Sequence, residues 1–82
     1  MGTSLEISLY PLTPEYVKPI RRFIDALNTY EGFEVMTNAM STQLHGDFAA
    51  VWEALGKELP RAFGAAHASV AVIKVLSIDV VS

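Results

Sequence analysis

The chain has 82 residues, of which 51% are hydrophobic and 18% are charged, and its formal net charge is −3 at pH 7. This length suits one domain, and the composition excludes an intrinsically disordered protein. Nucleic-acid binders draw affinity from a basic surplus, so 6 basic against 9 acidic side chains argue against that class. We expect residues 1–82 to form a single folded domain with no nucleic-acid partner.

Several features that carry particular chemistry are missing from the sequence. There is no cysteine, which excludes disulfides and cysteine zinc sites and favours a reducing compartment. The two histidines, His45 and His67, are far apart and lack a patterned carboxylate, so we expect neither a metal site nor a cofactor. No apolar run approaches the roughly 20 residues that cross a bilayer, and residues 1–8 do not resemble a signal peptide. We therefore expect a cytoplasmic protein without membrane insertion.

Four segments are predicted as β-strands. Residues 5–10, 33–38 and 40–45 alternate between apolar and polar side chains, which is typical of half-buried strands. Residues 68–80 are longer, richer in Val and Ile, and apolar on both sides. The second and third strands are joined closely at Asn38-Ala39, so these two are expected to form a hairpin.

The first helix lies between the first two strands. Thr13 is predicted as its N-cap and Pro14 as its first residue, and the helix should end near Tyr30, before Gly32. Pro19 would break a hydrogen bond inside such a helix. It therefore predicts either a kink or a later start.

A second helix is expected to follow Asp47, which is a plausible N-cap. Gly56 and Pro60 weaken its far half and predict a bend or a break before Pro60. One face is predicted to be buried and carries Phe48, Val51, Trp52, Leu55 and Leu59. The opposite, solvated face is predicted to carry Lys57, Glu58 and Arg61.

The order of strand, helix, strand, strand, helix and strand predicts the fold class. It is the α+β, ferredoxin-like βαββαβ sandwich, with an antiparallel four-stranded sheet and two helices on one face. Right-handed crossovers would place the first and third strands in the middle of the sheet. The predicted core consists of Leu5, Ile7, Leu9, Phe33, Val35, Met40, Leu44, Ile73 and Val75.

The sheet face away from the helices, called the open face below, is predicted to be covered. A strand that is apolar on both sides is usually covered on both sides. We therefore expect self-association through the open face, giving at least a dimer. The alternative is an exposed face of mixed polarity, which antiparallel sheets tolerate.

Polar side chains from three strands are expected to meet at one end of the sheet. Neighbouring strands run antiparallel in this fold, so the ends of the first and second strands lie beside the start of the third. The side chains concerned are Ser8, Tyr10, Thr37, Asn38, Ser41 and Gln43. A few polar groups within apolar walls are the usual form of a small-molecule site.

Short motifs at this end of the sheet resemble those of a known family. Residues 8–12 (SLYPL), Thr37, residues 40–42 (MST) and Gly46 resemble the YkoF-like thiamin/hydroxymethylpyrimidine-binding proteins. The resemblance implies ferredoxin-like domains that associate through their sheets. It also implies binding of thiamine or its hydroxymethylpyrimidine moiety in thiamine uptake or salvage, at a site between paired sheets, rather than enzymatic activity.

The sequence alone does not assign the roles of individual site residues. Ser41 could hydrogen-bond a pyrimidine or be an ordinary strand residue, whereas Thr42 should point into the core. Tyr10 could stack on a ligand or fill an interface between copies. A cationic ring would favour a nearby carboxylate or aromatic face, for which Glu34, Tyr10 and Trp52 are candidates.

Two other functions are compatible with this fold. One is a small dimeric ferredoxin-like enzyme, such as a haem- or quinone-handling monooxygenase. Trp52 and His45 are the residues that favour this alternative. No nucleophile, acid pair or positioned base stands out, so no catalytic residue is predicted. The other is a metabolite-sensing dimer. Since one fold hosts many functions, the fold cannot choose between them.

Overall fold

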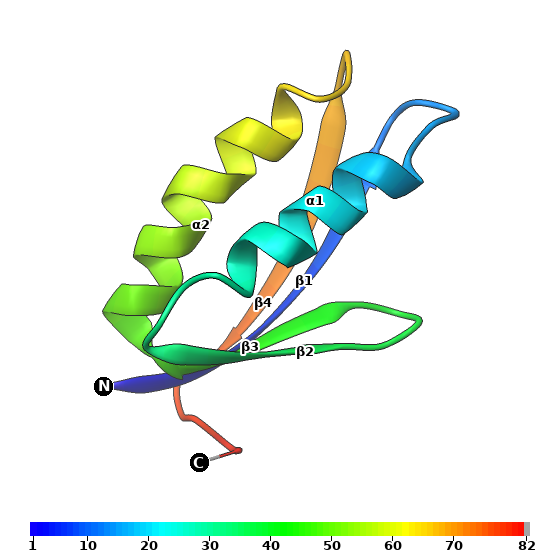
Figure 1. The fold of residues 1–82 in the computed structure, drawn as a ribbon. Helices are drawn as coiled ribbons and strands as arrows, with labels where there is room; N and C mark the ends of the chain where they lie inside the picture. The colour runs from blue at the N-terminus through cyan, green and yellow to red at the C-terminus, as the bar shows by residue number, and fades with distance from the viewer. Residues whose placement is uncertain (82) are drawn as a thin grey trace.

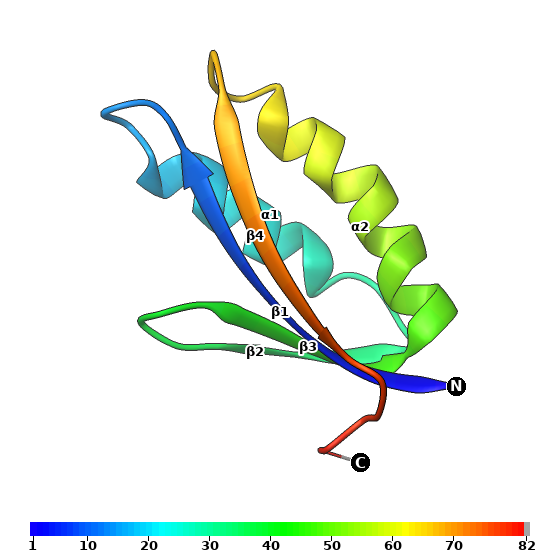
Figure 2. The same ribbon diagram turned by 180° about the vertical axis from the view of Figure 1, so that it is seen from behind.

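The computed structural model describes residues 1–81 and has the predicted order of elements (Figure 1). These are β1 (Gly2–Pro11), α1 (Val17–Leu27), β2 (Phe33–Thr37), β3 (Thr42–Asp47), α2 (Phe48–Phe63) and β4 (Ser69–Leu76). Both helices lie on the same face of the sheet, and the view from behind shows the strands uncovered (Figures 1 and 2). The fold is therefore the predicted ferredoxin-like α+β sandwich.

The sheet has the order β2-β3-β1-β4, and all three strand pairs are antiparallel. The first and third strands are central, as the right-handed crossovers require. β1 pairs with β4 as far as Pro11, but its pairing with β3 ends at Ile7, opposite Thr42. Residues 8–11 therefore have no strand partner on the hairpin side, where β2 and β3 splay away from β1 (Figure 1).

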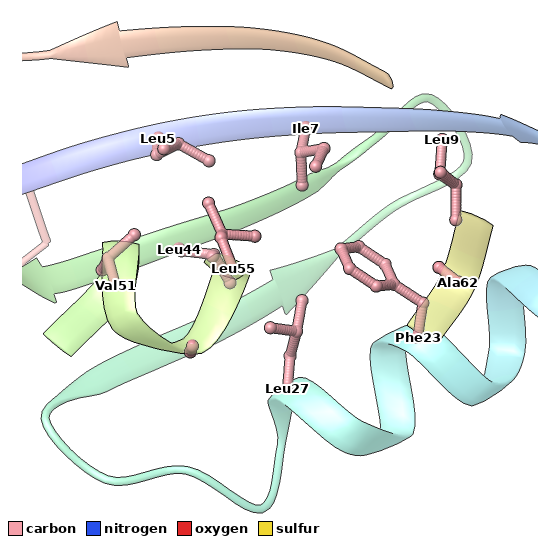
Figure 3. Close-up of a cluster of buried hydrophobic side chains, with 10 residues drawn as sticks. Leu5, Ile7, Leu9, Phe23, Leu27, Leu44, Val51, Leu55 and Ala62 are labelled. Carbon is pink, nitrogen blue, oxygen red and sulfur yellow. The ribbon is translucent and has the colours of Figure 1, made fainter. Parts of the chain in front are cut away.

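The core lies between the helices and the sheet (Figure 3). Its buried apolar residues are Leu5, Ile7, Leu9, Phe23, Leu27, Leu44, Val51, Ala54, Leu55 and Ala62. Phe33, Val35 and Ile73 pack against this cluster while remaining partly exposed. Seven of the nine predicted core residues are thus confirmed as contributors.

The prediction was wrong for two core residues. Met40 is 85% exposed, because β3 begins only at Thr42 and leaves Met40 in the hairpin loop. Val75 pairs with Leu5 and so lies on the helix side of the sheet, but it is 47% exposed. β4 is an edge strand, and the helices pack mainly against β1 and β3.

Helix α1 has the later start that Pro19 predicted, but it lacks the Thr13 cap and ends earlier than predicted. Its N-cap is Tyr16, without a side-chain hydrogen bond, and Thr13 instead accepts the Glu15 N–H at 3.4 Å in a local turn. Pro19 falls in the first turn, where backbone N–H groups have no partner inside the helix, so the proline is tolerated. The helix ends at Leu27 rather than Tyr30.

Helix α2 is longer than predicted, and the face that it buries is rotated about the helix axis relative to the predicted face. The Asp47 cap is confirmed by a 3.0 Å bond from the Ala50 N–H, and the helix continues past Gly56 and Pro60 to Phe63. The buried stripe is Val51, Ala54, Leu55, Glu58 and Ala62. Trp52 is therefore 37% exposed and contacts Phe48 at 6.1 Å between ring centroids, which contradicts its predicted burial.

Several strand boundaries also differ from the sequence expectation, and β1 begins at Gly2 rather than residue 5. β3 runs from Thr42 rather than residue 40, and β4 ends at Leu76 rather than residue 80. After Leu76 the chain turns back across the end of the open face, where the Val80 N–H donates to Ser4 Oγ at 3.0 Å (Figure 2). Within residues 1–81, no helix is long and apolar enough to span a membrane.

Candidate functional site

A cavity of about 490 Å³ lies between the end of β1, the β2–β3 loop and helix α1. Five of the six predicted site residues line it: Ser8, Tyr10, Thr37, Asn38 and Ser41. The cavity lies where β1 continues past the end of its pairing with β3. The splayed hairpin therefore forms one wall of the cavity.

The remaining wall of this cavity is largely apolar. It includes Ile7, Leu9, Ile20, Phe23, Ile24 and Met40. Tyr10 and Tyr16 also line the cavity, and both are about half exposed. The volume and the mixture of apolar wall with few polar groups are typical of sites for small organic molecules.

Asn38 organises the hairpin loop. Its side-chain Oδ1 accepts the N–H groups of Met40 at 2.8 Å and Ser41 at 3.0 Å. Its own N–H donates to the Ser41 carbonyl at 3.0 Å. A side-chain carbonyl that replaces backbone partners in this way is a common use of Asn in turns. The loop thus holds Asn38 and Ser41 side by side in the cavity wall.

The serine and threonine hydroxyls of the cavity each have a partner. Ser41 Oγ donates to Glu6 Oε2 at 2.9 Å, and Glu6 Oε1 lies 4.0 Å from Lys74 Nζ. Ser8 Oγ donates weakly to a loop carbonyl at 3.4 Å. Thr37 Oγ1 lies 3.3 Å from the hydroxyl of Thr42, which is buried as predicted.

Gln43, the sixth predicted residue, lines a different cavity of about 320 Å³ on the open face. Its Oε1 lies 2.9 Å from His45 Nε2, and His45 Nδ1 lies 2.8 Å from Ser4 Oγ. His45 is only 6% exposed. Since both ring nitrogens are occupied, we read Gln43, His45 and Ser4 as a structural network.

Of the three residues considered for a cationic ring, only Tyr10 lines the larger cavity. Glu34 is exposed at the far end of the hairpin, and Trp52 lies on α2. The nearest carboxylate to the larger cavity is Glu6, which lines the smaller cavity and reaches the larger one only through its hydrogen bond with Ser41. Sequence reasoning missed Glu6 as a site residue. The register could have indicated it, because Glu6 sits between Gln43 and Lys74 on the open face.

A second carboxylate, Glu58, is buried away from the cavity at the pairing of α1 and α2. Its Oε2 accepts the Tyr30 hydroxyl at 2.5 Å and Arg61 Nη1 at 3.0 Å. The hydrogen bond to this carboxylate, together with burial and the negative charge of Glu58, raises the pKa of Tyr30. The predicted solvated position of Glu58 was therefore wrong.

Metal binding has no support in the described part of the chain. Among residues 1–81, no three His, Asp or Glu side chains gather closely enough to hold an ion. The structure instead has a cavity whose largely apolar wall also carries hydroxyl and amide side chains. Together with the fold, they define a ferredoxin-like domain with a cavity sized for a small organic molecule.

The chain belongs to the YkoF-related family, whose model matches residues 2–80. This match spans nearly the whole sequence and confirms the resemblance seen in the SLYPL and MST segments. No curated protein matches the chain.

Solved structures confirm the fold. A Streptococcus pneumoniae protein is 24% identical with a TM-score of 0.87, covering 100% of this chain and 92% of that one. A hypothetical protein of Methanocaldococcus jannaschii is 23% identical with a TM-score of 0.83, covering 99% and 84%. A Thermotoga maritima protein, described as a candidate thiamine biosynthesis/salvage protein, is 14% identical with a TM-score of 0.80, covering 92% and 82%.

Proposed function

We propose that this protein binds thiamine or its hydroxymethylpyrimidine moiety and acts in thiamine uptake or salvage. The observation that carries the proposal is the 490 Å³ cavity, which gathers five of the six residues expected to bind such a ligand. Membership of the YkoF-related family and the description of the Thermotoga maritima protein support the same ligand class.

The cavity has the chemistry that an aminopyrimidine needs. The ring is flat and apolar on its faces and carries hydrogen-bonding groups at its edge. The wall offers aliphatic and aromatic side chains for the faces, and Asn38 and Ser41 for the edge. Tyr10 offers an aromatic surface for a positively charged ring.

We propose binding without turnover. The serine and threonine hydroxyls of the cavity contact a carbonyl, a carboxylate and another hydroxyl, whereas a nucleophilic hydroxyl is usually activated by a histidine or an amine. His45 lines the other cavity with both ring nitrogens occupied, and His67 is exposed. These positions support a binding role over the enzymatic alternative.

We further propose that two copies associate through their open faces. Val70, Val72 and Leu76 on β4 are each about half exposed and lie on that face with Tyr10. A surface of this kind can pair with its own copy about a two-fold axis, without needing another partner. Since Tyr10 also lines the cavity, such pairing would place the ligand beside the paired sheets.

Calorimetric titration of thiamine and of hydroxymethylpyrimidine tests the binding proposal. We expect saturable binding near one ligand per chain. Ser41→Ala should weaken affinity about tenfold, the effect of losing one good hydrogen bond. Ser77→Ala, which alters an exposed serine outside the cavity, is the matched control and should not change affinity. Absence of heat and of thermal stabilisation at millimolar ligand would refute the proposal.

A further inference from the structure

We propose that Glu6 fixes Ser41 as a hydrogen-bond acceptor and that the hairpin loop fixes Asn38 as a donor. The cavity then selects a ring that carries an amino group beside an unprotonated ring nitrogen. This inference rests on the proposed function and adds the direction of each hydrogen bond. It makes Glu6 a positioning residue that acts through Ser41.

The hydroxyl of Ser41 has one proton to donate. An ionised carboxylate can only accept, so the 2.9 Å contact between Ser41 Oγ and Glu6 Oε2 uses that proton. What Ser41 can still offer to the cavity is the lone pairs of its oxygen. Donation to a carboxylate also makes the oxygen a better acceptor, because hydrogen bonds in a chain polarise one another.

The amide of Asn38 has the opposite role. Its Oδ1 accepts two backbone N–H groups, at 2.8 and 3.0 Å, which fixes the end of the amide that carries oxygen. Nδ2 makes no hydrogen bond within residues 1–81, so the amino end remains available to donate. Asn38 therefore presents donors in the cavity wall beside the acceptor of Ser41.

This pair matches the edge of a 4-aminopyrimidine. The exocyclic amino group donates to Ser41 Oγ, and the adjacent ring nitrogen accepts from Asn38 Nδ2. An analogue with oxygen in place of the amino group presents an acceptor and a ring N–H, which is the reverse order. Sites built from fixed donors and acceptors reject such mismatches strongly.

The test compares thiamine with oxythiamine, its 4-oxo analogue, by calorimetry on the full chain. Both carry the thiazolium charge, so the effect of removing a negative charge cancels in the ratio of affinities. We expect the unaltered chain to prefer thiamine at least tenfold. Glu6→Gln should reduce this preference severalfold, because the new amide can donate to Ser41 and release its proton toward the ligand. Glu34→Gln, on the same face, should leave the ratio unchanged.

A second variant keeps the inference testable if Glu6→Gln folds poorly. Ser41→Ala removes the acceptor, so thiamine should lose affinity while oxythiamine does not. Thiamine binding with an equal preference in the unaltered chain and in Glu6→Gln would overturn the role of Glu6. Failure of the unaltered chain to bind either compound would overturn the proposed function itself, and with it this inference.

Discussion

At the scale of single residues, Glu58 shows how this small domain holds a carboxylate in its interior. The side chain is 5% exposed and shares one oxygen between Tyr30 and Arg61. A buried charge is tolerated when it is paired and hydrogen-bonded. Loss of one member should therefore leave the others poorly satisfied.

We expect Glu58→Ala to lower the free energy of unfolding by about 1–3 kcal/mol, because it removes the acceptor of two hydrogen bonds. The matched control is Glu53→Ala on the same helix, where an exposed carboxylate pairs with Lys57 at 3.4 Å. That change should cost less than about 1 kcal/mol. Urea denaturation of both variants measures the difference. Equal losses would show that the Glu58 network is not stabilising.

The same network predicts a dependence of stability on alkaline pH. The pKa of Tyr30 is raised by its hydrogen bond to Glu58, so the folded state favours the protonated phenol. Its contribution is complete below the unfolded pKa of about 10 and is lost as the pH rises through the higher folded pKa. Unfolding curves between pH 9 and 12 should fall more steeply for the unaltered chain than for Tyr30→Phe. Parallel curves would contradict the assignment.

At the scale of elements, Gly46 and Gly56 differ in the space around them, so substituting each by alanine gives a controlled comparison. A Cβ at Gly46 would lie 2.4 Å from the Gly32 carbonyl oxygen and 2.6 Å from Phe33 Cα. A Cβ at Gly56, in the exposed middle of α2, would meet nothing within 4 Å. Close backbone approach therefore requires glycine at the first position but not at the second.

We expect Gly46→Ala to destabilise the fold by at least about 1–3 kcal/mol, since backbone atoms of β2 would have to move. Gly56→Ala should stabilise it by about 0.5–1 kcal/mol, because alanine suits a helix interior better. Thermal unfolding of the two variants should show shifts of opposite sign. A stable Gly46→Ala variant would contradict the packing described between β2 and β3.

The sequence predicted all six elements in order, because periodicity and helix or strand breakers are local signals. The sequence-based prediction failed where tertiary contacts determine the helix start or the buried face. Thr13 looked like an N-cap, but the chain makes a turn before α1 starts at Val17. Ala54 and Ala62 carry too little hydrophobicity to mark the buried stripe of α2, so the larger Trp52 was placed inside.

The candidate site was predictable for a similar reason, and to a similar extent. Antiparallel topology alone brings the ends of β1 and β2 beside the start of β3, which located five cavity residues. The prediction for Gln43 was wrong because Gln43 lies two residues beyond Ser41 along the chain, which places it in the neighbouring cavity. The link from Ser41 to Glu6 depends on side-chain geometry between strands, which no local pattern in the sequence reports.

At the scale of the whole molecule, the open face predicts the oligomeric state. If two copies pair through it, light scattering should give at least twice the mass of one chain. Val72→Glu, which puts a charge on that face, should shift the protein to monomer. Val17→Glu alters an equally exposed valine on α1 and should leave the mass unchanged. A monomer at high concentration would exclude pairing through this face.

The most direct test of the central claim is nuclear magnetic resonance of the backbone amides during a thiamine titration. Binding in the 490 Å³ cavity predicts saturable shifts confined mainly to the amides of residues 8–10, 12 and 38–41, with those of Glu58 and Arg61 unmoved. Spectra that do not change at millimolar thiamine would contradict ligand binding. Shifts centred instead on His45 and Val80 would place the ligand in the other cavity and contradict the site.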